Sequence, residues 1–202
     1  MSCDEKVDCG RRRLLVATAT AGGVATVAAA VPFLASMAPS ERAKSAGAPV
    51  EADISKLAPG EMMTVEWRGK PVWIIHRIKE MIDGLAKIED KLVDPKSEKA
   101  QGEFDPPADV KADTRSIKPE IMVVVGICTH LGCSPTSKFK TGTESGVDAD
   151  WPGGFLCPCH GSTFDLAGRV YKNKPAPTNL PIPPHVYLSD ARILIGENTK
   201  GA

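Results

Sequence analysis

The chain has 202 residues, and its 25 basic and 25 acidic side chains leave a formal net charge of zero. This balance offers no basic excess for nucleic acid, so we expect no nucleic-acid partner. The length fits one globular domain with additional segments.

The first predicted element is an apolar segment near the N-terminus. Residues 14–38, LLVATATAGGVATVAAAVPFLASMA, contain no charged side chain. As a helix rising 1.5 Å per residue the segment would be about 37 Å long, which exceeds a hydrocarbon core of about 30 Å. No convincing cleavage site accompanies it. We therefore expect a single transmembrane anchor that the mature protein retains, in contact with membrane lipid.

Basic residues come directly before this segment, in the stretch RRRLL that spans residues 11–15. Three consecutive arginines favour a cytoplasmic N-terminus, and we predict a cytoplasmic tail over residues 1–13. The stretch is also similar to a twin-arginine export signal, with Arg11 and Arg12 as the pair. An ordinary signal-anchor with basic flanks is the alternative. The twin-arginine route carries folded proteins, so it suits a protein whose cofactor is assembled in the cytoplasm.

Residues 39–49 form a short connection after the anchor. They are small, polar and interrupted by proline and glycine, with no apolar period. This composition predicts a flexible hinge, and a disordered connection without a mechanical role is the alternative.

Residues 50–202 are predicted to form a mainly β head domain of short antiparallel strands with one inserted helix. Two strand-like runs flank a turn at residues 68–70, and residues 78–93 carry apolar side chains at helical spacing. The proline-broken stretch 94–120 is expected at the surface. The later predicted strands are 121–127, 163–165 and 169–171, followed by a proline-rich loop at 174–184 and a hairpin at 185–196 that turns at 189–191.

Two short motifs in the head carry the chemistry, CTHLGC at residues 128–133 and CPCHGS at residues 157–162. Each motif offers two thiols and one imidazole. Three kinds of site fit these residues: two disulfides, one structural zinc with two cysteines and two histidines, or a 2Fe-2S cluster with cysteine on one iron and histidine on the other.

The residues around the ligands favour the cluster. Gly132 and Gly161 permit tight loops whose backbone N–H groups approach sulfur. Ser162 is placed to donate a hydroxyl hydrogen bond. An anionic cluster requires such donors, and a zinc site requires fewer of them.

At this point the chain closely resembles the Rieske iron–sulfur family, on the motif pair CTHLGC and CPCHGS. The resemblance implies one 2Fe-2S cluster with Cys128 and Cys157 on the inner iron and His130 and His160 on the outer iron. It further implies that Ser162 supports the cluster. It also assigns a disulfide that links the two loops. The bridge would join Cys133 to Cys159, and it requires an oxidising compartment, in agreement with export.

The order of anchor, hinge, β head and proline loop resembles the iron–sulfur subunit of bacterial ubiquinol–cytochrome c reductase. The resemblance implies a proton-translocating oxidoreductase in the bacterial inner membrane, with the head on the periplasmic side. Its partners would be cytochrome b, a c-type cytochrome and ubiquinol, within a dimeric complex. His160 would be the catalytic residue that receives the proton of the quinol while the cluster takes the electron. Reduction adds negative charge, which favours the protonated imidazole.

Two other functions fit part of these observations. One is the Rieske subunit of another exported oxidoreductase, such as arsenite oxidase. The other is a membrane-tethered zinc-binding structural module.

The chain departs from the family at Phe164, where many members carry a tyrosine whose hydroxyl bonds a ligand sulfur. We therefore expect a lower reduction potential than in a tyrosine-bearing relative. The proline loop begins with Lys174, where the family often has glycine. The lone histidines His76 and His185 are assigned to structure. Finally, Cys3 and Cys9 are expected to be free thiols on the cytoplasmic side.

Overall fold

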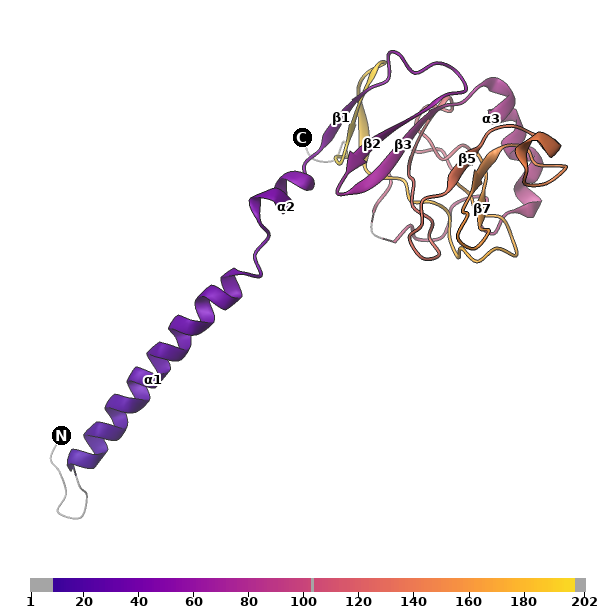
Figure 1. The fold of residues 1–202 in the computed structure, drawn as a ribbon. Helices are drawn as coiled ribbons and strands as arrows, with labels where there is room; N and C mark the ends of the chain where they lie inside the picture. Colours follow the sequence, from indigo (N-terminus) through magenta and orange to yellow (C-terminus); the bar gives the residue numbers. More distant parts are fainter. Residues whose placement is uncertain (1–8, 103, 199–202) are drawn as a thin grey trace. The chain divides into compact units, whose positions relative to one another are not determined.

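The computed structural model describes residues 9–102 and 104–198. The chain divides into two compact units, Met1–Ser45 and Ala46–Ala202. The first unit contains the helix α1 and most of the short helix α2, and the second is the head (Figure 1).

Helix α1 spans Cys9–Ala35. It is long and apolar enough to cross a membrane, and none of its residues is buried in the protein. Its threonines donate to main-chain carbonyls one turn earlier, as in the bond of 2.9 Å from Thr18 Oγ1 to Leu14 O. Such bonds satisfy hydroxyl groups where no water is present. The helix ends three residues before the predicted boundary at residue 38.

The start of this helix corrects one expectation. Cys9 is disulfide-bonded, so the prediction of a free thiol at this position is wrong. That prediction rested on the reducing compartment and not on geometry. Cys3 lies outside the described residues.

The predicted hinge contains a short helix, α2 at Glu41–Ala46. Its first turn is capped by Ser40, whose Oγ accepts a hydrogen bond of 3.2 Å from the backbone N–H of Ala43. A serine in this place and an acidic first residue both favour a helix start. The composition of residues 39–49 predicted no regular structure, and the cap explains the difference. The mobility of the segment remains a prediction.

The head consists of nine short strands in three antiparallel sheets, among its described residues. The sheets have the strand orders β1-β9-β8, β2-β3-β4 and β5-β6-β7. This confirms the predicted antiparallel β head. The strands are β1 Val50–Asp53, β2 Met62–Trp67, β3 Lys70–His76, β4 Ile121–Val125, β5 Thr136–Lys138, β6 Gly154–Leu156, β7 Thr163–Phe164, β8 His185–Ser189 and β9 Arg192–Ile195.

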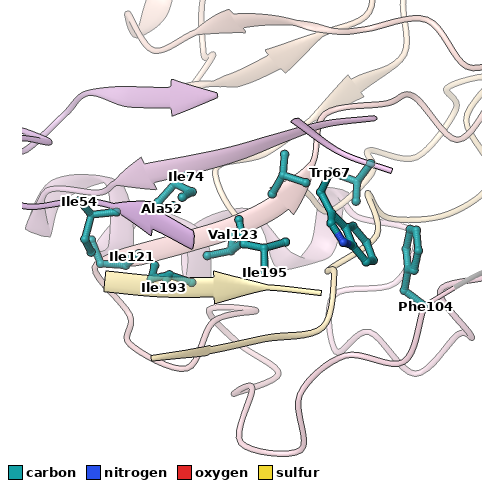
Figure 2. Packing of buried hydrophobic residues seen from close by; sticks show 11 residues of the cluster. Ala52, Ile54, Trp67, Ile74, Phe104, Ile121, Val123, Ile193 and Ile195 are labelled. Carbon is teal, nitrogen blue, oxygen red and sulfur yellow. The ribbon is translucent and has the colours of Figure 1, made fainter. Parts of the chain in front are cut away.

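The sheet β2-β3-β4 separates two hydrophobic cores. Successive side chains of a strand point to opposite faces, and every residue of β4 is buried. Val123 faces the first core, where it lies beside Ile193 and Ile195 of β9 (Figure 2). Trp67 closes one end of this core, with its ring centroid 5.2 Å from that of Phe104.

The second core lies on the other face of the same sheet and contains part of the predicted site. Met122 and Val124 of β4 pack in one cluster with Cys128 and Cys157. Trp73 of β3 stacks on Phe155 there, with ring centroids 4.9 Å apart. Cys128 and Cys157 therefore pack against this face of the central sheet.

The single helix predicted over residues 78–93 is wrong in its extent. The structure has α3 at Lys79–Leu85, which continues as a 3₁₀ helix, η1, at Ala86–Lys91. Gly84 lies in the last turn of α3, and glycine weakens an α-helix by about 1 kcal/mol relative to alanine. Helices commonly tighten to 3₁₀ geometry at their ends. A second 3₁₀ turn, η2, lies at Gly142–Ser145.

The expectation that residues 94–120 lie at the surface is wrong in part, because several side chains of this otherwise mostly exposed or half-buried stretch are buried. Phe104 is 6% exposed, and Arg115 and Ser116 are each 1% exposed. Arg115 is buried because its guanidinium group donates to main-chain carbonyls of distant segments. Such contacts leave no periodic pattern in the sequence. The predicted strand at 169–171 is likewise absent, and only isolated bridges pair Val170 and Tyr171 with other segments.

Candidate metal centre

The two cysteine motifs fold into loops with the same hydrogen-bond pattern. In the first, Cys128 N donates to Cys133 O at 2.8 Å and Gly132 N donates to Cys128 O at 3.0 Å. In the second, Cys157 N donates to Ser162 O at 2.7 Å, and the N–H of the glycine at 161 donates back to Cys157 O at 3.0 Å. The two loops therefore share one hydrogen-bonded backbone pattern, which begins at Cys128 in the first and at Cys157 in the second.

A glycine makes the turn in each loop. Gly132 has a φ of +82° and Gly161 a φ of +75°, values that favour glycine because a Cβ is strained there. The first loop begins after Gly126, where an added Cβ would lie 2.2 Å from the Trp73 ring. The motif glycines predicted as loop formers therefore do take this role.

The four predicted ligand side chains come from these two loops. Cys128 and Cys157 are each 2% exposed, and their thiols hydrogen-bond each other. The rings of His130 and His160 lie with centroids 4.8 Å apart at an interplanar angle of 86°. His160 is exposed and His130 is half-buried. The structure thus brings two thiols together on the inner side and two imidazoles together on the solvent side.

The remaining cysteine pair forms a disulfide across the loops. Cys133 is bonded to Cys159, which are the two residues that the family resemblance assigns to the bridge. The sulfur atoms of Cys133, Cys157 and Cys159 all lie within 4.8 Å of one another. Two of these three sulfurs are bonded to each other, however, so only Cys157 of this group keeps a thiol that can bind a metal.

The environment of Cys128 suits a thiolate that is bound to metal. Burial raises the pKa of the Cys128 thiol, and the backbone N–H of His130 and the hydroxyl of Ser162 act in the opposite direction by hydrogen bonding. The neighbouring Cys157 thiol adds to the rise. Two thiolates buried side by side repel each other, so their joint deprotonation requires a cation between them.

The proline loop is bonded to both ligand loops. Ala176 N donates to Ser162 Oγ at 3.0 Å, and Thr129 Oγ1 donates to Thr178 O at 2.7 Å. Ser162 was predicted from its motif. The sequence reasoning missed Thr129, although its position inside the first motif was the available signal.

Three further residues named in the sequence analysis, Phe164, His76 and His185, have structural contacts. Phe164 of β7 is fully buried in the second core, in the same cluster as Cys128 and Cys157. His76 Nδ1 is 2.8 Å from Leu57 O and His185 Nδ1 is 2.9 Å from Pro183 O, so both lone histidines are bonded to backbone.

The donor set fits a 2Fe-2S cluster with unlike ligands on its two irons. Two adjacent buried thiols could supply one pair of ligands and two adjacent imidazoles on the solvent side could supply the other. The hydroxyl of Ser162 hydrogen-bonds the Cys128 sulfur, as expected for support of an anionic group.

Comparison with known proteins decides the family. Residues 100–184 match the Rieske [2Fe-2S] domain, and residues 1–40 match the twin-arginine (TAT) signal of the ubiquinol–cytochrome c reductase Fe-S subunit. The ubiquinol–cytochrome c reductase iron–sulfur subunit of Allochromatium vinosum is 60% identical over 193 residues, which cover 95% of this chain and 91% of that protein. The chain belongs to this family. The subunit of the same name from Bradyrhizobium diazoefficiens is 41% identical over 91% of this chain and 92% of its own length.

As a member of this family, the chain holds one Rieske 2Fe-2S cluster and acts as an electron-transfer subunit of an oxidoreductase, anchored by a single membrane pass. These matches disfavour the zinc module and the arsenite oxidase subunit. A solved structure titled "Hyperthermophilic respiratory Complex III" aligns at 26% identity over 88% of this chain and 97% of that chain, with a TM-score of 0.44.

Proposed function

We propose that this chain accepts electrons from ubiquinol one at a time and delivers each to a c-type cytochrome, in a membrane complex with cytochrome b. When bound, the 2Fe-2S cluster supplies the one-electron chemistry. The observation that carries the proposal is the pair of adjacent imidazoles on the solvent side of two buried thiols.

Cys128 and Cys157 would hold the inner iron, and His130 and His160 the outer iron. The thiols are buried next to each other, so they suit the side that is shielded from water. Neutral imidazole is a common metal ligand, and the two histidines lie on the solvent side of the thiols. The Cys133–Cys159 disulfide ties the two loops at the same end as the ligands, which limits their separation.

His160 would receive the proton of the quinol. Its side chain is exposed, and an imidazole that binds metal through one ring nitrogen keeps the other for a hydrogen bond. A quinol hydroxyl placed against this nitrogen can donate its proton there. Arrival of the electron adds negative charge nearby, which favours the protonated imidazole and couples the two transfers.

The orientation of the chain in the membrane would determine the side on which the proton is released. Residues 11–13 are arginines, which favour a cytoplasmic N-terminus and hence a periplasmic head beyond the single pass. A proton released from His160 would then leave on the periplasmic side, so quinol oxidation would contribute to proton translocation. Helix α1 would lie against lipid and cytochrome b, in a dimeric complex.

The residues between anchor and head would act as the hinge. The head must exchange electrons with two partners, and movement of the segment 39–49 would allow one cluster to reach both. The six-residue helix α2 in this segment is too short to be stable on its own in water, so it can unwind at small cost.

Purification of the full chain from its native membrane tests the proposal. A tag at the C-terminus should retain b-type and c-type haem together with the chain, and the purified complex should reduce a c-type cytochrome with ubiquinol. Retention of a different oxidoreductase without b-type haem would contradict the proposal and favour the other exported enzyme.

A further inference from the structure

Three buried guanidinium groups meet at the turn that follows the second cysteine motif, residues 165–168. Each holds a different one of three consecutive residues of this turn. The contacts are Arg169 Nε to Asp165 Oδ2 at 2.7 Å, Arg77 Nη1 to Leu166 O at 3.0 Å and Arg115 Nη1 to Ala167 O at 2.7 Å.

Arg115 differs from the other two in what its second branch binds. Its Nη2 donates to Leu180 O at 2.8 Å, so it connects the turn to the proline loop. The other bonds of Arg77 go to residues 114–119, and those of Arg169 go to Leu85 and Pro95. Among these contacts, only those of Arg115 reach the proline loop.

The proline loop in turn contacts the donor that faces a ligand sulfur. Ala176 N donates to Ser162 Oγ at 3.0 Å, and the Ser162 hydroxyl bonds the Cys128 sulfur. A hydroxyl has one hydrogen and two lone pairs. Because Ala176 N–H occupies a lone pair of Oγ, it helps to fix the direction in which the hydroxyl hydrogen points, towards Cys128.

The backbone between Ala176 and Leu180 is conformationally restricted. Pro177 has a fixed φ, and the side chain of Asn179 accepts a hydrogen bond of 2.9 Å from Val170 N. We therefore expect a shift of Leu180 to disturb the short intervening backbone and the position of Ala176.

We propose that Arg115 is a positioning residue for the 2Fe-2S site, which holds the proline loop so that Ala176 N–H keeps the Ser162 hydroxyl aimed at the Cys128 sulfur. The inference rests on the proposed ligand role of Cys128. The guanidinium does not touch the ligands. It acts through two main-chain carbonyls, that of Ala167 in the turn and that of Leu180 in the proline loop.

Arg77 provides a matched control for the loss of buried charge. It holds the same turn and is 2% exposed against 1% for Arg115, and none of its hydrogen bonds described above reaches the proline loop. Arg115→Met and Arg77→Met both remove one buried guanidinium, and both should lower the melting temperature. Arg115→Met should loosen the contact between Ala176 and Ser162 directly, whereas Arg77→Met can reach that contact only through the segment that carries Arg115.

The experiment measures the reduction potential by EPR-monitored redox titration of the full chain in its membrane complex. Arg115→Met should lower the potential in the same direction as Ser162→Ala, and Arg77→Met should leave it near that of the wild type. In the double variant Arg115→Met/Ser162→Ala, the potential should equal that of Ser162→Ala alone. That outcome is expected because Arg115 acts through the hydroxyl that is already gone.

Equal shifts in Arg115→Met and Arg77→Met, or fully additive shifts in the double variant, would overturn the inference. Arg115→Lys keeps the charge if Arg115→Met fails to fold. A single ammonium group lacks the two-branched geometry of guanidinium, so the reduction potential of Arg115→Lys should also fall. A reduction potential equal to that of the wild type would overturn the inference. Absence of a cluster signal from the wild-type chain would instead refute the proposed function.

Discussion

Replacement of Phe164 by tyrosine tests how closely the second core approaches the ligand sulfurs. Phe164 is fully buried in one cluster with Cys128 and Cys157. The added hydroxyl has no water to bond, so it must find a protein partner or remain unsatisfied. We expect the partner to be a ligand sulfur, as in family members that carry tyrosine at this position.

The size of the effect follows from the difference between two redox states. A hydrogen bond to a charged group contributes about 1.5–3 kcal/mol, and only the part that grows when the electron arrives changes the potential. A difference of about 1.4 kcal/mol corresponds to about 59 mV for one electron. Phe164→Tyr should therefore raise the reduction potential by some tens of millivolts.

The assay combines a redox titration with thermal unfolding of the same sample. If the hydroxyl reaches sulfur, the potential rises and the melting temperature changes little. If it finds no partner, an unsatisfied buried hydroxyl costs about 1–3 kcal/mol, and the melting temperature falls by several degrees. Phe104→Tyr is the control, since Phe104 lies in the other core. A Phe164→Tyr potential at or below that of the wild type would refute the reasoning.

Three further predictions concern the hinge, the disulfide and a buried histidine. Replacing residues 45–47 by three prolines should slow quinol oxidation and leave the EPR spectrum intact, and unchanged turnover would favour a passive connection. Cys133→Ser or Cys159→Ser should weaken iron retention, because the bridge holds the two ligand loops together. Full iron content in both variants would show that the disulfide is dispensable. Burial lowers the pKa of His185, so the unfolded chain binds a proton that the folded chain does not, and stability should fall as the pH drops below about 6.5. This group changes the free energy of unfolding by at most about 1.4 kcal/mol per pH unit. His185→Gln should flatten the dependence of that free energy on pH, measured by chemical denaturation.

The ligand loops could be predicted because their chemistry is contiguous in the sequence. Each motif places two thiols, one imidazole and one glycine within a few residues, and the structure folds both into the same hydrogen-bonded loop. The pairing of the four cysteines was not determined by spacing, since four cysteines allow three connectivities. Family resemblance supplied the pair Cys133 and Cys159.

The parts that could not be predicted depend on contacts between distant segments. Arg115 lies in a proline-broken stretch with no apolar period, and it is buried because it donates to carbonyls 52 and 65 residues away in the chain. The cap at Ser40 and the change from α to 3₁₀ geometry near Gly84 are local effects that apolar periodicity does not report. The strands β3 and β4 were predictable because both faces of the central sheet are buried, which gives continuous apolar runs.

The central claim is that Cys128 and Cys157 bind one iron of a 2Fe-2S cluster and that His130 and His160 bind the other. Pulsed EPR of the reduced chain, labelled with ¹⁵N-histidine and kept in its membrane complex, tests this claim most directly. We predict two directly coordinated histidine nitrogens, and loss of the native spectrum in either His130→Ala or His160→Ala. A reduced cluster without coupling to histidine nitrogen, or zinc in place of iron on metal analysis, would contradict the account.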